Sequence, residues 1–229
     1  LLDAVVSVNK NIVLVLMNGR PLDLSRPSDQ VPVLLETWFL GSEAGNAIAD
    51  VVFGDYNPSG KLPVSFPRNV GQEPLYYNQK NTGRPSSNMV TYSGYQDESR
   101  DALYPFGFGL SYTNFSYGDP EVPDAKFSGE GSIAVSVVLK NTGKVTGKET
   151  VQLYIRDLVA SRTRPVKELR DFKQIELAPG ESSKVTFTIN SKTLEFFTSN
   201  AKWEAEPGEF EIMIGSNSVD LKTVKITYE

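Results

Sequence analysis

One stretch decides the fold of the first half of the chain: Trp38-Phe-Leu-Gly-Ser-Glu-Ala-Gly-Asn-Ala-Ile-Ala-Asp-Val-Val-Phe-Gly-Asp-Tyr-Asn-Pro-Ser-Gly-Lys-Leu-Pro-Val-Ser-Phe-Pro67. Its centre predicts an amphipathic helix, because the apolar residues fall on one face: Ala44, Ala47, Ile48, Val51 and Val52. Ser42 is a suitable N-cap, and Gly54 can take the left-handed conformation that ends a helix. A turn at 57–60 and a short strand over 62–66 are predicted to follow.

Continuous apolar runs before this stretch predict strands that are buried on both faces. Ile12–Met17 is uninterrupted and ends at Asn18-Gly19, and residues 31–35 repeat the pattern up to Trp38. The end of a helix is expected before the first strand, with its apolar positions at Leu2, Ala4, Val5 and Val8. Strand and helix signals therefore alternate here, which predicts a layered α/β region.

The rest of the chain changes character twice. Residues 67–118 show no sustained period and predict a long loop wrapped over a neighbour. From about residue 128 the period becomes two, with apolar alternation at 133–139, 151–155, 185–189, 210–214 and 224–228. Several such strands in about 100 residues predict an antiparallel β-sandwich. We therefore expect two domains, 1–118 and 119–229, with a linker at 119–127 and a crossing segment at 157–167 that docks onto the α/β part.

The amino-acid composition excludes several kinds of catalytic and binding site. The 229 residues include no cysteine and no histidine, which excludes a disulfide framework, a thiolate nucleophile, Ser-His-Asp catalysis and histidine ligation of a metal. We expect no cofactor and no metal. The net charge of −5 is spread evenly, without the basic face that nucleic acid or an anionic membrane requires. The longest apolar run, Ile12–Met17, is far below the roughly 20 residues of a membrane helix, so no membrane insertion is expected.

Several segments resemble one known family in collinear order. The stretch 38–67 resembles the signature of the second domain of family 3 glycoside hydrolases, and so do Val15–Pro21 and Tyr104–Tyr112. The segments 164–172 and 177–181 are similar to those of the fibronectin III-like domain that closes many of these enzymes. Asn81-Thr-Gly-Arg-Pro85 resembles the bacterial periplasmic β-glucosidase branch. The resemblance implies the C-terminal portion of the family's α/β sandwich domain over 1–118 and an all-β fibronectin III-like sandwich over 119–229.

The resemblance also implies an activity for the whole enzyme. Members of the family are retaining exo-acting hydrolases in which an N-terminal barrel supplies an Asp nucleophile and the α/β domain an acid/base Glu. Retaining chemistry needs the two carboxyl groups about 5–5.5 Å apart. The acid/base Glu of the family lies upstream of the segment matching Val15–Pro21, and residues 1–11 contain no Glu. We therefore expect no catalytic carboxylate in this sequence, and the expected partners are the missing barrel and a β-glucoside or oligosaccharide.

Further expectations concern the start of the chain, the location of the protein and its substrate. The chain starts at Leu1 with neither Met nor a signal-peptide pattern, which predicts a fragment or processed product. The resemblance implies a periplasmic or secreted location. A β-xyloside or N-acetylglucosaminide remains an alternative substrate, because the same motifs occur with several specificities. A non-catalytic carbohydrate-binding module is the alternative from another class, although the sandwich has a single tryptophan, Trp203.

Acidic residues in tempting positions have simpler interpretations. Glu43 is best explained as an anion at a helix N-terminus, with a second role at the edge of the sugar pocket as the alternative. Asp50 fits a polar flank of the helix, and Asp55 fits a turn. The charged cluster in the long loop favours a solvated surface over a general acid or a metal site, because its spacing is not that of a calcium loop; it comprises Asp97, Glu98, Arg100 and Asp101.

Aromatic residues and one arginine are the candidates for contacts with a sugar. Trp38 follows a buried strand and is favoured as a core residue, although strand ends in open α/β sheets are also where ligands bind. The long loop carries Tyr76 and Tyr77 as further aromatic candidates. The residues that we expect to line the leaving-group side of the pocket are Arg84, Tyr92 and Tyr95, because long loops often carry function.

Overall fold

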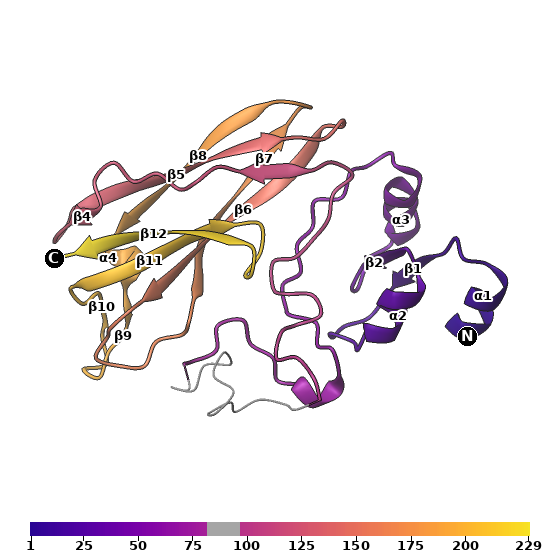
Figure 1. The fold of residues 1–229 in the computed structure, drawn as a ribbon, viewed down its shortest axis with the longest axis horizontal. Coiled ribbons are helices and arrows are strands. Elements are labelled where there is room, and N and C mark those ends of the chain that lie inside the picture. The colour runs from indigo at the N-terminus through magenta and orange to yellow at the C-terminus, as the bar shows by residue number, and fades with distance from the viewer. Residues whose placement is uncertain (82–96) are drawn as a thin grey trace.

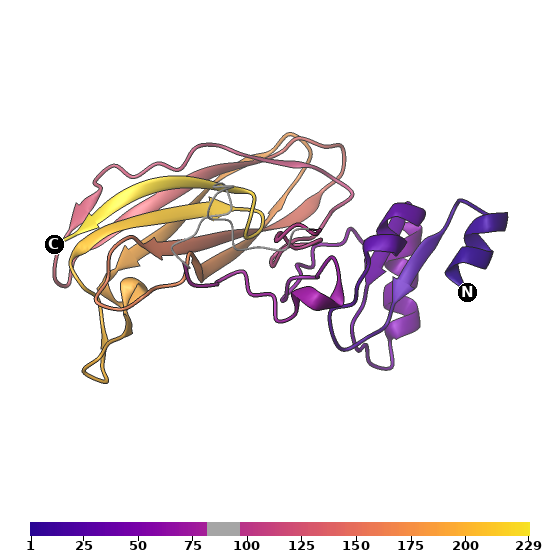
Figure 2. The same cartoon turned by 60° about the horizontal axis from the view of Figure 1, so that its bottom comes forward.

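The computed structural model describes residues 1–81 and 97–229 and contains two parts joined by extended chain. A small α/β part holds the N-terminus and a β-sandwich holds the C-terminus (Figure 1). Turning the molecule by 60° keeps the two parts apart, with the extended segments between them (Figure 2). The predicted order of an α/β region followed by a sandwich is confirmed.

The α/β part is built on two short parallel strands, β1 (Val13–Leu16) and β2 (Val33–Glu36). Its helices are α1, α2 and α3, and a 3-10 turn, η1, follows; their bounds are Leu2–Val8, Ser25–Gln30, Ala44–Phe53 and Val70–Gln72. The strands and the helix at 44–53 were predicted, because continuous apolar runs and helical spacing are local signals. The short helix α2 was not, because Ser25-Arg-Pro-Ser-Asp-Gln30 offers no apolar face.

Two local predictions in this part are wrong. Glu43, not Ser42, occupies the N-cap position of α3, and no side-chain capping bond is present there. Gly54 ends the helix with φ of 87°, as expected. Residues 62–66 form no regular strand: Leu62 and Phe66 donate 2.8 Å backbone bonds to Phe108 and Tyr104, and they accept bonds from the N–H groups of Gly107 and Leu103, at 2.8 and 2.9 Å. Proline has no N–H to donate, so Pro63 and Pro67 limit the ladder.

The sandwich consists of a five-stranded sheet, β4-β12-β11-β6-β7, and a three-stranded sheet, β3-β5-β8. The long strands are β5, β6, β7, β8, β11 and β12, at Ser132–Asn141, Gly147–Asp157, Glu168–Leu177, Ser182–Asn190, Gly208–Gly215 and Leu221–Tyr228. The short elements are β3, β4, α4, β9 and β10, at Phe115–Tyr117, Lys126–Phe127, Ser191–Leu194, Phe196–Phe197 and Trp203–Glu204.

One apolar core lies between the two sheets. Residues that alternate along the strands point inward from both sides, and the fully buried ones include Val135, Leu139, Leu153, Phe187 and Ile212. This burial confirms the five alternating runs seen in the sequence. The edge strand β7 was not predicted, because half of its ten residues are exposed, only one is buried, and its charged side chains interrupt the alternation. Charge on an edge strand also discourages pairing with another chain.

The predicted linker at 119–127 is part of the sandwich. Glu121 and Ser136 exchange two backbone hydrogen bonds of 2.8 and 2.9 Å, and β4 pairs with β12 in parallel. Upstream of it, β3 already pairs with β5. The segment therefore follows the sandwich surface because its backbone groups find partners there.

Residues of the stretch 38–67 join the two parts. Lys61 Nζ lies 3.1 Å from Glu149 Oε2 on β6, and the two side chains are only 13% and 6% exposed. The Tyr117 hydroxyl donates a 2.8 Å bond to the same carboxylate. Burial and the charge of Glu149 raise the pKa of the Tyr117 phenol above its ordinary value. Asn57 adds a 2.9 Å bond to the carbonyl of Thr146.

A second set of contacts holds the loop 104–112 against the sandwich. Gln152 donates to the carbonyls of Gly107 and Ser216, at 3.0 and 2.7 Å. Tyr77 stacks on Phe106 with ring centroids 4.2 Å apart, and its hydroxyl accepts a 3.2 Å bond from the Leu169 backbone N–H. The loop is therefore fixed by polar and aromatic contacts from both parts.

Candidate functional site

The carboxyl ends of β1 and β2 meet at one edge of the small sheet, where open α/β folds place ligands. Thr37 N–H and Oγ1 both donate to the carbonyl of Leu16, at 3.0 and 2.7 Å. These bonds hold the residue that follows β2 against the last residue of β1. The next residue, Trp38, has φ of 53°, which is uncommon for a residue with a large side chain. Its N–H donates a 2.9 Å bond to Glu36 Oε1, so this carboxylate holds the turn.

Aromatic rings form the floor of this edge. The Trp38 and Phe66 ring centroids lie 5.7 Å apart, and Tyr104 meets Phe66 edge-on at 6.5 Å. Phe66 is 1% exposed, so the interpretation of Trp38 as a residue that packs on the core fits this contact. The Phe39 ring lies over Gly19, where a Cβ added to Gly19 would come within 2.3 Å of that ring. Only glycine allows this approach.

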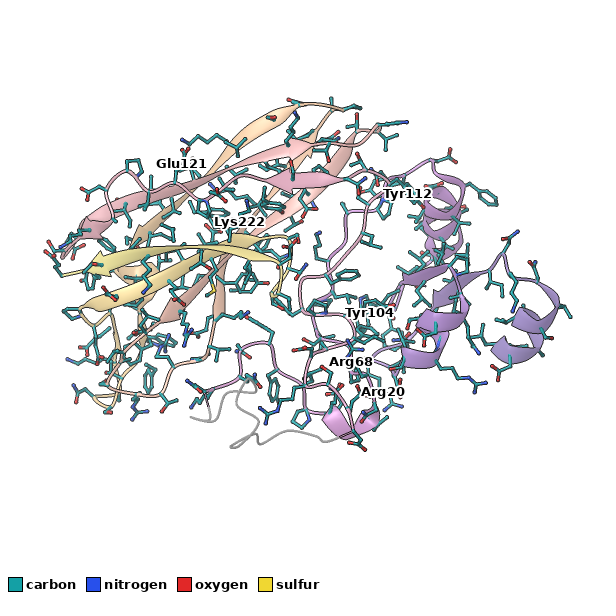
Figure 3. All side chains as sticks on the ribbon, viewed as in Figure 1. Arg20, Arg68, Tyr104, Tyr112, Glu121 and Lys222 are labelled. Carbon is teal, nitrogen blue, oxygen red and sulfur yellow. The ribbon has the colours of Figure 1, made fainter. Side chains whose placement is uncertain are left out.

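Cationic and phenolic side chains gather beside the same edge. In the view of Figure 3, Arg20, Arg68 and Tyr104 are on the side of the α/β part that meets the long loop. Arg68 Nε donates a 3.1 Å bond to the carbonyl of Asp101, which ties the start of the long loop to a residue further along it. Burial raises the pKa of the Tyr104 phenol, and this residue therefore remains a neutral hydrogen-bonding group.

Two oxygens at this edge are buried and have no hydrogen-bond partner among residues 1–81 and 97–229. They are Glu36 Oε2 and Asn18 Oδ1, one at the end of each strand. A buried acceptor without a donor is costly, so the pair is suited to hydroxyl or amide donors brought from outside the described residues. Sequence reasoning passed over both residues, although a polar residue at the end of a parallel strand is a signal for this position: Glu36 is the last residue of β2, and Asn18 follows β1 by two residues.

The helix-associated carboxylates have no chemical environment that would make them catalytic. Glu43 is exposed and accepts a 2.6 Å bond from Asn46 Nδ2, as expected for an anion beside a helix N-terminus. Asp50 and Asp55 are also exposed. The simple interpretations of all three residues fit these positions.

The charged cluster of the long loop is held by local bonds. Ser99 N–H donates to Glu98 Oε1 at 2.9 Å, and Ser99 Oγ donates to Asp101 Oδ2 at 3.2 Å. These contacts make a turn, which fits the interpretation as a solvated surface. Within the part of the chain that the structure describes, no group of three or more acidic residues is arranged to hold a metal ion.

The aromatic candidates of the long loop separate into different environments. Tyr76 is 64% exposed, whereas Tyr77 is occupied by its stack on Phe106. Arg84, Tyr92 and Tyr95 lie outside the described residues, so their role at the leaving-group side stays a prediction. The crossing segment contacts the long loop: the Val166 backbone N–H donates a 2.9 Å bond to the carbonyl of Gln79, which lies outside the strands and helices of the α/β part.

The described helices share one further property: none of them has both the length and the apolar character needed to cross a membrane.

Comparison with known proteins identifies the two parts. Residues 1–112 match the glycosyl hydrolase family 3 C-terminal domain, and residues 149–218 match the fibronectin type III-like domain. A periplasmic beta-glucosidase of Salmonella typhimurium is 50% identical over 226 residues, which is 97% of this chain and 29% of that protein. A beta-xylosidase of Formosa agariphila is 44% identical over 99% of this chain and 31% of its own length.

A solved structure agrees with these relatives. The beta-glucosidase from Listeria innocua in complex with isofagomine matches with a TM-score of 0.93 and 37% identity, over 99% of this chain and 32% of that one. The chain thus spans about a third of the length of the proteins it matches. It belongs to glycosyl hydrolase family 3, carrying the C-terminal domain of that family followed by a fibronectin type III-like domain.

Proposed function

We propose that the chain is the C-terminal part of a retaining exo-β-glucosidase that removes terminal β-D-glucosyl residues, with nucleophile and acid/base both supplied from outside residues 1–229. The observation that carries this proposal is the 50% identity along 97% of the chain to a periplasmic beta-glucosidase of which it covers 29%. The long loop would contribute Arg84, Tyr92 and Tyr95 to the leaving-group side of the pocket.

The carboxyl edge of β1 and β2 supports a binding role in the complete enzyme. Its unpartnered oxygens on Glu36 and Asn18 are free acceptors, and the Trp38 and Phe66 rings pack together beside them. Exposed apolar side chains on the α/β part include Val13, Met17, Val33, Phe39 and Phe53. Apolar surface of this kind favours contact with the remainder of the protein, and a parallel pair of strands is otherwise covered on both faces.

The sharpest test is a chimera. Residues 1–229 replace the matching third of the Salmonella typhimurium relative, and hydrolysis of 4-nitrophenyl β-glucoside is compared with that of the unaltered relative. We expect turnover by the chimera and none by the chain alone, because double displacement needs a nucleophile. Turnover by the chain alone that is abolished by Glu36→Gln or Glu43→Gln contradicts the proposal.

A second substrate has specific support. The beta-xylosidase relative is 44% identical over 99% of the chain, only slightly less than the glucosidase relative. The same chimera assayed on 4-nitrophenyl β-xyloside measures whether the C-terminal third affects the choice of sugar. We further propose a periplasmic or secreted location for the complete protein, which fractionation of the cells that produce it would test.

A further inference from the structure

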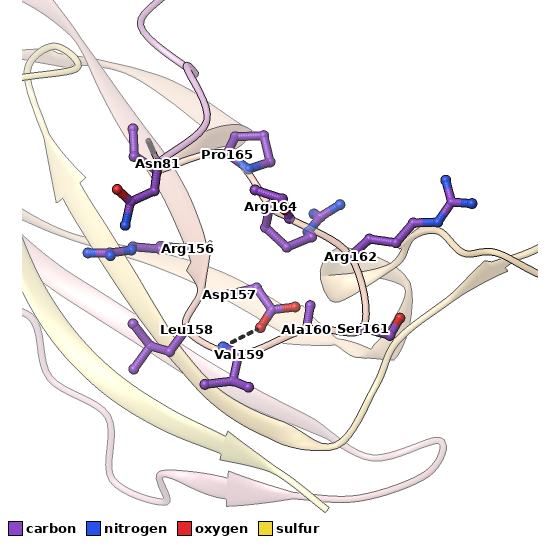
Figure 4. Close-up of a pocket in the computed structure, with 12 residues that line it drawn as sticks. Asn81, Arg156, Asp157, Leu158, Val159, Ala160, Ser161, Arg162, Arg164 and Pro165 are labelled. Carbon is purple, nitrogen blue, oxygen red and sulfur yellow. Dashed lines mark hydrogen bonds between the residues drawn. The ribbon is translucent and has the colours of Figure 1, made fainter. Parts of the chain in front are cut away.

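The long loop is attached to the sandwich at residues 77–81. The Gln79 carbonyl accepts its 2.9 Å bond from the Val166 N–H, and Lys80 pairs with Pro165 in an antiparallel bridge. Figure 4 shows the next residue, Asn81, beside Pro165 at a hollow in the sandwich surface that both residues line. The backbone of this stretch therefore follows the crossing segment, because its polar groups find partners there.

Tyr77 is the side chain that fixes this stretch. Its ring stacks on Phe106 with centroids 4.2 Å apart and meets the ring of Tyr154 edge-on at 5.8 Å. Its hydroxyl accepts the 3.2 Å bond from the Leu169 N–H. Tyr154 is fully buried on β6, and Leu169 belongs to β7. One ring thus joins the loop to two strands of the five-stranded sheet, in the geometries that aromatic pairs prefer.

The residues around Tyr77 are themselves held in place. The Ser218 N–H donates a 3.0 Å bond to the Phe106 carbonyl, and the Tyr154 hydroxyl donates to Gln152 Oε1. The amide of Gln152 donates in turn to two backbone carbonyls. The surface that receives the Tyr77 ring is therefore already ordered by hydrogen bonds of its own.

The far flank of the same loop is attached to the α/β part instead. Gln72, which is 5% exposed, donates a 2.6 Å bond from Nε2 to the Ser99 carbonyl, and Arg68 donates its 3.1 Å bond to the Asp101 carbonyl. Residues 82–96 connect these two flanks in the sequence, and they include the three residues proposed for the leaving-group side. The two ends of the proposed substrate loop are thus fixed to different parts of the molecule.

We propose that Tyr77 is a positioning residue of the complete enzyme, through which the sandwich holds the substrate-contacting part of the long loop at the leaving-group side of the sugar pocket. The inference rests on the proposed function, because it requires loop residues that touch the substrate. Contacts that are already ordered lose less conformational entropy when a ligand binds. Releasing the sandwich end of the loop should therefore weaken substrate binding, whereas the carboxylates that perform the chemistry stay unchanged.

The kinetic test uses the chimera with the Salmonella typhimurium relative. Tyr77→Ala removes both ring contacts, and we expect KM for 4-nitrophenyl β-glucoside to rise at least about fivefold. We expect kcat to change by less than about twofold, the pattern of lost uniform binding. A smaller amount of folded enzyme would instead lower kcat and leave KM unchanged, so the two effects are distinguishable. Tyr77→Phe keeps the ring and should restore a KM close to that of the wild type.

Two further variants test whether Tyr77 acts through the loop. Trp203→Ala is the matched control: it removes an aromatic ring of the sandwich that is 63% exposed and pairs with Phe197, and it should leave KM unchanged. Combining Tyr77→Ala with Tyr92→Ala should raise KM by less than the product of the two single effects, because both changes remove the same contact. Should Tyr77→Ala not fold, Tyr77→Leu replaces it with the same expectations.

The attachment itself is measured on the 229-residue chain without any assay of turnover. Trypsin cleavage after Lys80, which pairs with Pro165, should be faster in Tyr77→Ala than in the wild type and unchanged in Trp203→Ala. Equal cleavage of all three proteins would overturn the attachment.

The kinetic outcomes separate this inference from the function on which it rests. An active chimera in which Tyr77→Ala leaves KM unchanged, or in which Trp203→Ala raises KM equally, would overturn the positioning role and leave the hydrolase function standing. A wild-type chimera without turnover would overturn the proposed function and the positioning role together.

Discussion

Lys61 Nζ lies 3.1 Å from Oε2 of Glu149, and this buried ion pair connects two residues 88 positions apart. Lys61 also donates a 3.2 Å bond to the carbonyl of Gly109, so three segments meet at one ammonium group. The resemblance to glycoside hydrolases rests partly on Asn57-Pro-Ser-Gly-Lys61, and the structure shows two of these residues, Asn57 and Lys61, bonded to the sandwich.

Removing the cation should destabilise the whole chain. Lys61→Met leaves the Glu149 carboxylate, 6% exposed, with Tyr117 as its donor, and breaking a buried pair costs about 3–5 kcal/mol. The matched control is Lys126→Met, which removes one side of the exposed Lys126–Glu229 pair and should cost about 0–1 kcal/mol. Urea denaturation measures the stability of both variants. Equal losses would show that the buried ion pair contributes no more to stability than the exposed one. The double variant Lys61→Met/Glu149→Met should lose less than the two single variants together.

Gly107 should tolerate alanine worse than Gly180, although both have left-handed backbones, with φ of 80° and 79°. An alanine costs about 1–2 kcal/mol at either site for the backbone alone. At Gly107 the added Cβ would lie 2.1 Å from Oε1 of Gln152, whose amide is held by bonds to Gly107 and Ser216, whereas nothing lies within 4 Å at Gly180. We expect an extra loss of about 1–3 kcal/mol for Gly107→Ala, and thermal unfolding of the two variants compares them directly.

Asp157 should make the stability of the chain depend on pH. Burial raises its folded-state pKa above the unfolded value of about 3.9, so its contribution is fully present below the unfolded pKa and is lost as pH rises through the folded pKa. Arg164 opposes this shift, and Glu206 and Glu168 add to it. Asp157→Asn should therefore gain stability relative to wild type as the pH is raised from acid to neutral.

The measurement is urea unfolding at a series of pH values, with the stability difference between variant and wild type plotted against pH. Asp124→Asn serves as the control, because Asp124 is exposed and makes only a local contact with the Lys126 N–H. A flat difference for Asp157→Asn would contradict the assignment of the shift to burial.

Residues 113–229 should fold alone, because every member of the large core cluster lies between Phe127 and Ile226. A domain of this size needs no disulfide. Residues 119–229 should be less stable, since they lack β3 and the Tyr117 hydroxyl that reaches Glu149. Residues 1–112 should associate or stay unfolded, since their strands lack cover. Calorimetry and gel filtration of the three fragments test this division, and a cooperative monomeric 1–112 would contradict it.

In the chimera, Tyr92→Ala, Tyr95→Ala and Arg84→Ala should each lower kcat/KM on an aryl β-glucoside by about tenfold or more, the loss of one contact worth about 1.4 kcal/mol. Tyr76→Ala is the control, because Tyr76 is 64% exposed. If all four variants behave alike, the three loop residues do not contact substrate.

The sequence alone was sufficient wherever the signal is local. Apolar runs and alternation located β1, β2, α3 and five long strands of the sandwich, because burial on one or both faces imposes a period on neighbouring residues. It failed at β7, an edge strand in which only one residue of ten is buried, and at 62–66, where two prolines remove ladder donors.

Only the tertiary structure could show which distant residues meet. The partners of Lys61, the orphan oxygens of Glu36 and Asn18, and the placing of Asn81 beside Asp157 and Arg164 come from chain segments far apart in sequence. A periodic pattern records whether a side chain is buried but not what lies against it. Charge pairing and hydrogen bonding depend on the contacting atoms, and these are set when the sandwich closes against the loop 104–112 and the residues that precede it.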